Sequence, residues 1–175
     1  MGRRILYIAQ SLDGFIADAE GGVSWLDPYQ SGDEDYGYAE FLAGVEAILM
    51  GSRTYLQVLD FGSWPYPGTP AWVVTHRELP VPAAADVRFA AGPMTDVLRD
   101  VQEDTPGDCW IVGGAEVVGQ LIAEDLLDAI VLFVAPVLLG SGVRLFPANR
   151  DLALELTGAR TYQSGLVELR YRRAC

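Results

Sequence analysis

The sequence predicts an α/β fold with a mainly parallel central sheet and an antiparallel edge at its C-terminal end. Short apolar segments alternate with segments whose apolar residues recur at helical spacing through the middle of the chain. The last two segments read as strands joined by a tight turn at Ser164-Gly165. A length of 175 residues suits a single domain over 1–175, and 50% hydrophobic residues can fill its core.

The elements follow from periodicity and from turn residues. The expected strands span residues 4–10, 15–17, 47–50, 71–75, 87–90, 109–112, 129–134, 152–162 and 166–173. The expected helices span residues 33–44, 52–59, 95–103 and 115–123. Asp33 and Thr95 are the expected N-caps of the first and third of these helices. Residues 18–32 and 62–70, rich in Gly, Asp or Pro, are expected to be loops.

Charge and composition exclude several classes of protein. The net charge is −12, so we do not expect nucleic-acid binding through a basic face. All twelve basic residues are Arg, which excludes lysine-based chemistry. One His and two Cys cannot form a structural zinc site or a disulfide framework, and we expect no metal. The longest apolar run, from Ala129 to Leu139, is too short to span a bilayer, and no signal peptide is visible, so a cytoplasmic protein without a membrane partner is expected.

Three strand ends carry groups that can bind an anion, because ligands of such sheets lie at the carboxyl ends of the strands. The first, Gly51-Ser52-Arg53-Thr54, places an Arg at a helix start. The second, Val112-Gly113-Gly114-Ala115-Glu116, offers bare backbone at another. The third, Thr75-His76-Arg77, can bind a terminal phosphate, and His76 can act as a base. Each also has an ordinary explanation: an N-cap with a surface Arg, a tight turn, and a solvated strand end.

Two carboxylates and two aromatic residues are further candidates. Asp13 stands before a glycine, where a turn residue is common. Asp35 lies in the first turn of the expected helix, where an acid also suits the helix dipole. Either can relay a proton if it faces a pocket. Trp25 and Trp64 can stack on a flat heterocycle or cover the core.

Four motifs in order resemble the dihydrofolate reductase-like superfamily. They are Ser11-Leu12-Asp13-Gly14, Gly51-Ser52-Arg53-Thr54-Tyr55, Val112-Gly113-Gly114 and Pro136-Val137-Leu138-Leu139-Gly140-Ser141-Gly142. Within that superfamily the chain is most similar to the C-terminal reductase domain of the bifunctional riboflavin-biosynthesis deaminase/reductase, and the likeness runs from Arg4 to Arg173. It implies a three-layer α/β/α fold and an NADPH site. The HxE and PCxxC motifs of the zinc deaminase half do not occur.

The resemblance also assigns roles to residues. Gly51, Ser52, Arg53 and Thr54 would hold cofactor phosphates, and Thr75, His76 and Arg77 would meet the adenosine 2′-phosphate. Gly113, Gly114, Ala115 and Glu116 would cradle the pyrophosphate, with a cis peptide at Gly113–Gly114. Ala9, Ile16 and Val112 complete the expected cofactor contacts. Asp13, Trp25 and Asp35 would contact substrate; Asp13 would orient it, and Asp35 or a bound water would supply the proton.

Together these features lead us to expect an NADPH-dependent reductase that transfers a hydride to a pyrimidine or pteridine-like substrate. Its expected activity resembles that of 5-amino-6-(5-phosphoribosylamino)uracil reductase of riboflavin biosynthesis. The alternatives are dihydrofolate reductase activity and a non-catalytic module that binds or senses a nucleotide. The resemblance further implies a homodimer, for which the 129–139 run and the C-terminal strands are candidate interfaces, although core packing explains the same residues.

Overall fold

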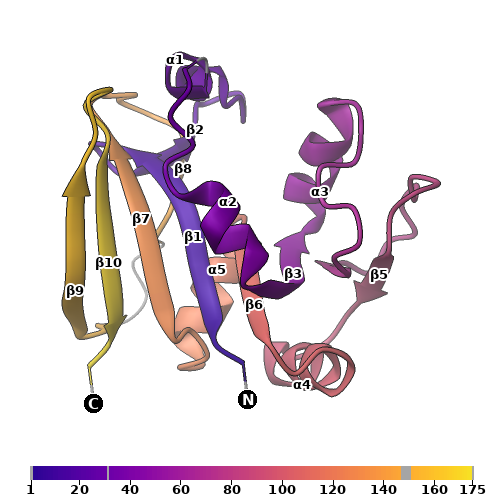
Figure 1. The fold of residues 1–175 in the computed structure, drawn as a ribbon. Coiled ribbons are helices and arrows are strands. Elements are labelled where there is room, and N and C mark those ends of the chain that lie inside the picture. The colour runs from indigo at the N-terminus through magenta and orange to yellow at the C-terminus, as the bar shows by residue number, and fades with distance from the viewer. Residues whose placement is uncertain (1, 31, 147–150, 175) are drawn as a thin grey trace.

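The computed structural model describes residues 2–30, 32–146 and 151–174 and contains an eight-stranded sheet in the order β5-β4-β3-β6-β1-β7-β10-β9 (Figure 1). Its strands are β1 (Arg4–Ser11), β3 (Val45–Gly51), β4 (Ala71–Val74), β5 (Val87–Ala90), β6 (Asp108–Gly113), β7 (Ala129–Ala135), β9 (Leu154–Thr161) and β10 (Val167–Arg173). From β5 to β7 all neighbours pair in parallel, and β10 is antiparallel to both β7 and β9. The α/β class with an antiparallel C-terminal edge is confirmed.

Helices cover both faces of the sheet, as the three-layer prediction requires. The helices are α2 (Tyr38–Ala43), α3 (Ser52–Asp60), α4 (Met94–Asp104) and α5 (Ala115–Ala123). Figure 1 shows α2 in front of β1 and α5 behind it. Leu6 and Ile111 belong to the core under α4 and α5, whereas Met50 and Trp110 belong to the core that includes Tyr55 of α3. Both cores are made of side chains that neighbouring parallel strands send to opposite faces.

The central strands are apolar because they are buried on both faces. In β3 the side chains from Ala47 to Met50 are fully buried. A strand buried on both faces reads as a continuous apolar run instead of an alternating one. No helix among the described residues is long and apolar enough to cross a bilayer.

The helix expected over residues 33–44 begins later, at Tyr38. Tyr36 has φ +56° and Gly37 has φ +75°, and neither backbone conformation continues an α-helix. The carboxylate of Asp35 accepts hydrogen bonds from the amides of Gly37 and Ala39, at 2.9 and 3.3 Å. The prediction that Asp33 is the N-cap was therefore wrong; Asp35 takes the free amides at this helix start.

Other expectations need smaller corrections. Helix α4 begins at Met94 after Pro93, without a side-chain cap from Thr95. The loop expected over 18–32 contains a 3₁₀ turn, η1 (Ser24–Leu26), and a one-turn helix, α1 (Asp27–Gln30). The strand expected from residue 152 begins at Leu154. The two-residue strand β8 (Val143–Arg144), which pairs with β2 (Phe15–Ala17), carries no sequence signal because it is too short for a period to show.

Candidate functional site

The three predicted anion-binding junctions are neighbours in space. Strands β4, β3 and β6 are adjacent and parallel, so their carboxyl ends meet at one edge of the sheet. The register places Gly51 opposite Val74, and Met50 opposite Gly113. The segment Thr75–Arg77 follows β4 directly. The fold thus brings together three segments that are spread along the sequence from Gly51 to Glu116.

Two of these junctions form a surface that we name the glycine cradle, defined by Gly51, Gly113, Gly114 and Thr54. The peptide between Gly113 and Gly114 is cis, as the family resemblance implies. A Cβ on Gly51 would lie 3.8 Å from the amide nitrogen of Gly114, and a Cβ on Gly114 would lie 3.3 Å from the Thr54 hydroxyl. Side chains at these positions would fill the space between the two strand ends. Without these side chains, a ligand that approaches the edge can come close to the half-buried backbone of Gly51 and Gly114.

Helices α3 and α5 both start at this cradle. Each is nine residues long, and no side chain of the described residues caps the first turn of either helix. The first amides of a helix have no partner inside the helix and attract an anion. Ser52 and Ala115 open the two helices directly after Gly51 and Gly114, so their amides lie next to these glycines. This donor set fits a pyrophosphate.

The charged residues of the cofactor side lie at the surface around the cradle. The guanidinium of Arg53 donates to the carboxylate of Glu116 at 2.9 Å, and both side chains are more than three-quarters exposed. A pair so exposed is weakly held and can open for a ligand. His76 and Arg77 are exposed after β4, and Arg77 makes no ion pair with any described residue. Among the described residues, Arg77 is thus a cation without an ion-pair partner, and it lies at the same edge of the sheet as the cradle.

The candidate substrate residues Asp13, Trp25 and Asp35 lie on the other side of this edge, and we name them the carboxylate corner. Asp13 follows β1, and its carboxylate accepts hydrogen bonds from the Ser11 hydroxyl (2.6 Å) and from the amides of Leu139 (3.1 Å) and Gly140 (2.7 Å). These bonds lower the pKa of Asp13 to about 2, the Ser11 hydroxyl most strongly. The residue fastens the β1–β2 turn to the loop after β7, which agrees with a structural role for that Pro- and Gly-containing loop.

Asp35 is held by its neighbours. The amides of Gly37 and Ala39 lower the pKa of its exposed carboxyl, so it is ionised at neutral pH. The next residue, Tyr36, packs edge-on against Tyr162 and Phe133, with ring centroids 4.9 and 6.4 Å apart. Phe133 stands opposite Ala9 in the sheet register. The Asp35 turn is therefore fixed near the carboxyl ends of β1 and β7.

Trp25 and the remaining predicted contacts surround the same strand ends. Trp25, like Ala9, packs against the cluster that contains Phe133, and its buried indole N–H has no hydrogen-bond partner among the described residues. A buried donor without a partner is available to a ligand or a water. Ile16 packs against the core under α4 and α5. Val112 belongs to the core under α2 and α3. Trp64 donates its indole N–H to Tyr66 in the core.

Sequence reasoning missed two polar residues at the end of β1. Ser11 is fully buried; its hydroxyl donates to Asp13 and accepts from the amide of Phe15 at 2.9 Å. Gln10 carries a buried side-chain oxygen that has no hydrogen-bond partner in the part of the chain that the structure describes. The signal that identifies them is the change from an apolar strand to two adjacent polar residues just before the turn.

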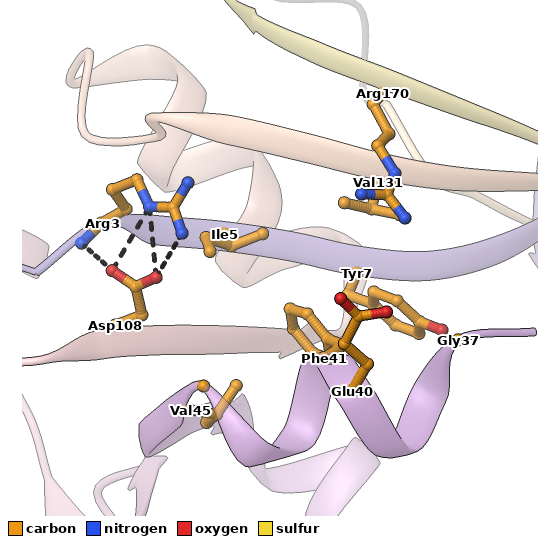
Figure 2. A pocket seen from close by; sticks show the side chains of 11 residues that line it. Arg3, Ile5, Tyr7, Gly37, Glu40, Phe41, Val45, Asp108, Val131 and Arg170 are labelled. Carbon is orange, nitrogen blue, oxygen red and sulfur yellow. Dashed lines mark hydrogen bonds and ion pairs between the residues drawn. The ribbon is translucent and has the colours of Figure 1, made fainter. Parts of the chain in front are cut away.

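A hollow of about 200 Å³ is lined by residues of β1 and α2 and by Gly37, whose amide donates to Asp35 (Figure 2). Arg3, just before β1, and Asp108, the first residue of β6, form an ion pair on one side of it, and Glu40 and Arg170 face it further along. None of the predicted site residues lines it. In the part of the chain that the structure describes, no three His, Cys, Asp or Glu side chains are grouped to hold a metal.

A known protein family matches most of the chain. A family model described as the RibD C-terminal domain matches residues 5–168. The chain belongs to the RibD C-terminal domain family. Its Bacillus subtilis (strain 168) relative "Uncharacterized protein YwjB" is 33% identical over 174 residues, which is 98% of both chains. A second protein of that strain, "Uncharacterized protein YyaP", is 27% identical over 182 residues, 97% of this chain and 94% of the relative.

Solved structures agree with membership in the RibD C-terminal domain family. A Shewanella sp. PV-4 protein whose name assigns it to riboflavin biosynthesis superposes with a TM-score of 0.87 at 28% identity, over 99% of each chain. The Thermotoga maritima deaminase/5-amino-6-(5-phosphoribosylamino)uracil reductase gives a TM-score of 0.76 at 16% identity, over 99% of this chain and 57% of that one. The chain thus spans a little over half of that bifunctional protein. The fold is that of the RibD reductase domains and is dihydrofolate reductase-like, as the motifs indicate.

Proposed function

We propose that this protein is an NADPH-dependent reductase that transfers a hydride to a pyrimidine or pteridine-like substrate. The observation that carries the proposal is the glycine cradle. Gly51 and the Gly113–Gly114 peptide lie side by side at two helix starts that no side chain caps. Membership in the RibD C-terminal domain family supports the same assignment.

The cofactor would lie along the edge formed by β4, β3 and β6. Amides at the start of α3 and α5 would bind the pyrophosphate, with Thr54 and Ser52 adding hydroxyl groups. Arg77, which lacks a described ion-pair partner, would bind the 2′-phosphate that distinguishes NADPH from NADH. The Arg53 side chain would break its ion pair with Glu116 and bind a phosphate instead. NADPH would supply the hydride, and the protein supplies position and charge.

The substrate would lie between the cradle and the carboxylate corner. Ala9 has the small side chain that lets a flat ring approach the strand, and the unpartnered Trp25 N–H offers a donor to it. Asp35 is ionised, so it suits the binding of substrate N–H groups and the orientation of a water that delivers the proton. Asp13 would hold the loop after β7 in place around the substrate.

The first substrate to test is 5-amino-6-(5-phosphoribosylamino)uracil. Its reduction adds a hydride to the sugar carbon beside nitrogen and a proton to the sugar oxygen, so the ribosylamino group becomes a ribitylamino group. Loss of NADPH absorbance, together with a product heavier by two hydrogen atoms, supports the proposal. Consumption of NADPH with dihydrofolate instead favours dihydrofolate reductase activity. Binding of NADPH without turnover on either compound favours a non-catalytic module.

A further inference from the structure

Glu168 is a buried carboxylate whose hydrogen bonds lead to the turn that carries Asp35. It lies on β10 and is 1% exposed. Its Oε2 accepts a hydrogen bond from the Tyr162 hydroxyl at 2.6 Å, and its Oε1 accepts one from Nε of Arg170. A buried carboxylate destabilises a protein unless such partners compensate it. The fold therefore pairs this group closely with Tyr162, the residue that follows β9.

Tyr162 connects Glu168 to the Asp35 turn. Its ring packs edge-on against the ring of Tyr36, with 4.9 Å between the centroids, and its hydroxyl oxygen lies 3.4 Å from the Tyr36 carbonyl oxygen. The hydroxyl of Tyr7, on β1, lies 3.5 Å from the same carbonyl oxygen. Two tyrosine hydroxyls from different parts of the sheet thus converge on one peptide of the turn.

The proton of the Tyr162 hydroxyl belongs to the bond with Glu168. A hydroxyl has one proton to donate, and its distance to Glu168 is the shorter of the two. Burial and the bond to Glu168 raise the pKa of Tyr162 to about 12, so the hydroxyl keeps this proton at neutral pH. Glu168 therefore fixes the position of the Tyr162 ring, and the ring in turn packs against Tyr36.

The conformation of Tyr36 makes this support necessary. Tyr36 has φ +56°, which side chains with a Cβ rarely adopt, so contacts around it must maintain the turn. The turn directs the amides of Gly37 and Ala39 to the carboxylate of Asp35, at 2.9 and 3.3 Å. A turn that loosens at Tyr36 would move these donors, and Asp35 would lose its fixed orientation.

The strand that precedes Tyr162 adds a charge on the same side. The guanidinium of Arg160, on β9, lies 4.7 Å from the ring centroid of Tyr162. The amides of Gly37 and Ala39 lower the pKa of Asp35 most strongly, and the charge of Arg160 lowers it further. The β9–β10 hairpin thus supports the Asp35 turn through both packing and charge.

We infer that Glu168 and Tyr162 are positioning residues that hold the Tyr36 peptide and thereby orient the Asp35 carboxylate toward the substrate. The inference rests on the proposed function, in which Asp35 orients the water that delivers the proton. Tyr162 lies 126 positions after Tyr36, so the C-terminal hairpin completes a site that the first part of the chain begins. Both residues act through Asp35 and leave the glycine cradle unchanged.

Amide hydrogen exchange tests the hold on the turn without a substrate. The exchange rates of the Gly37 and Ala39 amides are measured by NMR in the wild type and in Tyr162→Phe. This variant keeps the ring but frees it from Glu168, so both rates should rise about tenfold. Tyr171→Phe makes the same change where the ring packs against the core under α4 and α5, and it should leave both rates as they are.

Glu168→Gln tests the other partner of the same bond. A neutral amide oxygen accepts a weaker hydrogen bond from the Tyr162 hydroxyl than a carboxylate does, so the two exchange rates should rise about threefold. Glu155→Gln removes a carboxylate that pairs with Arg172 in the same hairpin, at 2.8 Å, and should have no effect on these rates.

A double-mutant cycle tests whether Tyr162 acts through Asp35. The rate of hydride transfer in single turnovers is measured with 5-amino-6-(5-phosphoribosylamino)uracil or dihydrofolate, whichever the wild type reduces. Tyr162→Phe should lower this rate about tenfold and leave NADPH affinity unchanged. In the Asp35→Asn background the same change should lower the rate less than about twofold, because the group that Tyr162 positions is gone.

Two results overturn the inference. One is that Tyr162→Phe and Glu168→Gln exchange as Tyr171→Phe does; the other is that Tyr162→Phe costs the same factor in rate with and without Asp35. A wild type that shows the expected exchange but reduces neither compound overturns the proposed function instead. Far-UV circular dichroism checks folding, and if Glu168→Gln misfolds, Tyr162→Phe decides, because it retains the packing of the ring.

Discussion

The two halves of the candidate site direct their polar groups differently. In the glycine cradle, two helix starts have no side-chain cap, and the nearby Arg77 has no described ion-pair partner. At the carboxylate corner, Asp13 accepts three hydrogen bonds and Asp35 accepts two, all from the protein itself. The cradle thus keeps donors for a ligand, whereas the corner uses its acceptors to fix loops.

This difference shows that a carboxylate near the site, such as Asp13 or Asp35, is not a proton donor merely because of its position. Backbone amides hold the pKa of Asp35 below its usual value, and the Ser11 hydroxyl and two amides lower that of Asp13. Both carboxylates are charged at neutral pH. A proton for the proposed reduction must therefore come through water, with the corner supplying geometry and negative charge.

The largest expected effect is on turnover, from Asp35→Asn. We expect the rate of hydride transfer in single turnovers to fall about a hundredfold, because the amide cannot orient the proton-delivering water as a carboxylate does. NADPH affinity should stay unchanged. Glu34→Gln, next in the chain, is the control for charge and should leave the rate as it is. An Asp35→Asn rate equal to the wild type across the pH range would show that the corner is only structural.

The next largest effect is on cofactor selectivity, from Arg77→Ala. A charged hydrogen bond to the 2′-phosphate contributes about 1.5–3 kcal/mol, so NADPH affinity should fall about tenfold to a hundredfold. NADH lacks this phosphate and should bind Arg77→Ala as it binds the wild type. Arg99→Ala on α4 is the matched control. Equal losses of affinity for both cofactors, measured by calorimetric titration, would show that Arg77 does not bind the 2′-phosphate.

Gly113→Ala should have smaller effects, and it should lower both the stability of the protein and its affinity for NADPH. Gly113 has φ +124°, which an alanine reaches at a cost of about 1–3 kcal/mol in the free energy of unfolding. We also expect about a tenfold loss of NADPH affinity, because the strained backbone shifts the cradle amides from the phosphates. Gly62→Ala is the control, since Gly62 has φ +104° and no atom within 4 Å of an added Cβ. It should lose stability and keep its affinity; equal affinities in both variants would contradict the cradle.

The smallest expected effect is that of Asp13→Asn on Tm, and this effect depends on pH. A carboxyl whose pKa falls from 3.8 to about 2 on folding stabilises the protein above pH 3.8, and this contribution is lost as the pH falls toward 2. The variant should melt below the wild type at neutral pH, and the difference should shrink between pH 4 and 2. Asp60→Asn, at the exposed end of α3, controls for the loss of one charge. A difference in Tm that is constant with pH would contradict the role given to Asp13.

The cradle could be predicted from the sequence because its signals are local. A glycine after an apolar strand and a helix start after it are visible within about six residues, and parallel strands bring such ends to one edge. The cis peptide at Gly113–Gly114 came from the family resemblance instead.

The sequence predicted which residues form the carboxylate corner but not their contacts. These contacts join residues far apart in the sequence or depend on irregular backbone. The bonds from Leu139 and Gly140 to Asp13 join residues 126 and 127 positions apart. The helix start near Asp35 was misplaced because Tyr36, a residue with a Cβ, takes a left-handed conformation that no sequence rule favours. The β-bulge opposite Arg170 and Tyr171 depends on the pairing of β9 with β10 and leaves no periodic signal in the sequence of β9.

The central claim is that the glycine cradle binds NADPH, and a titration tests it most directly. The protein has four Trp residues, so NADPH and NADH are each added while Trp fluorescence is followed, for the wild type, Gly113→Ala and Gly62→Ala. The cradle predicts saturable quenching that is tighter for NADPH than for NADH, weakened by Gly113→Ala and unaffected by Gly62→Ala. Absence of saturable binding of either cofactor to the folded wild type would contradict it.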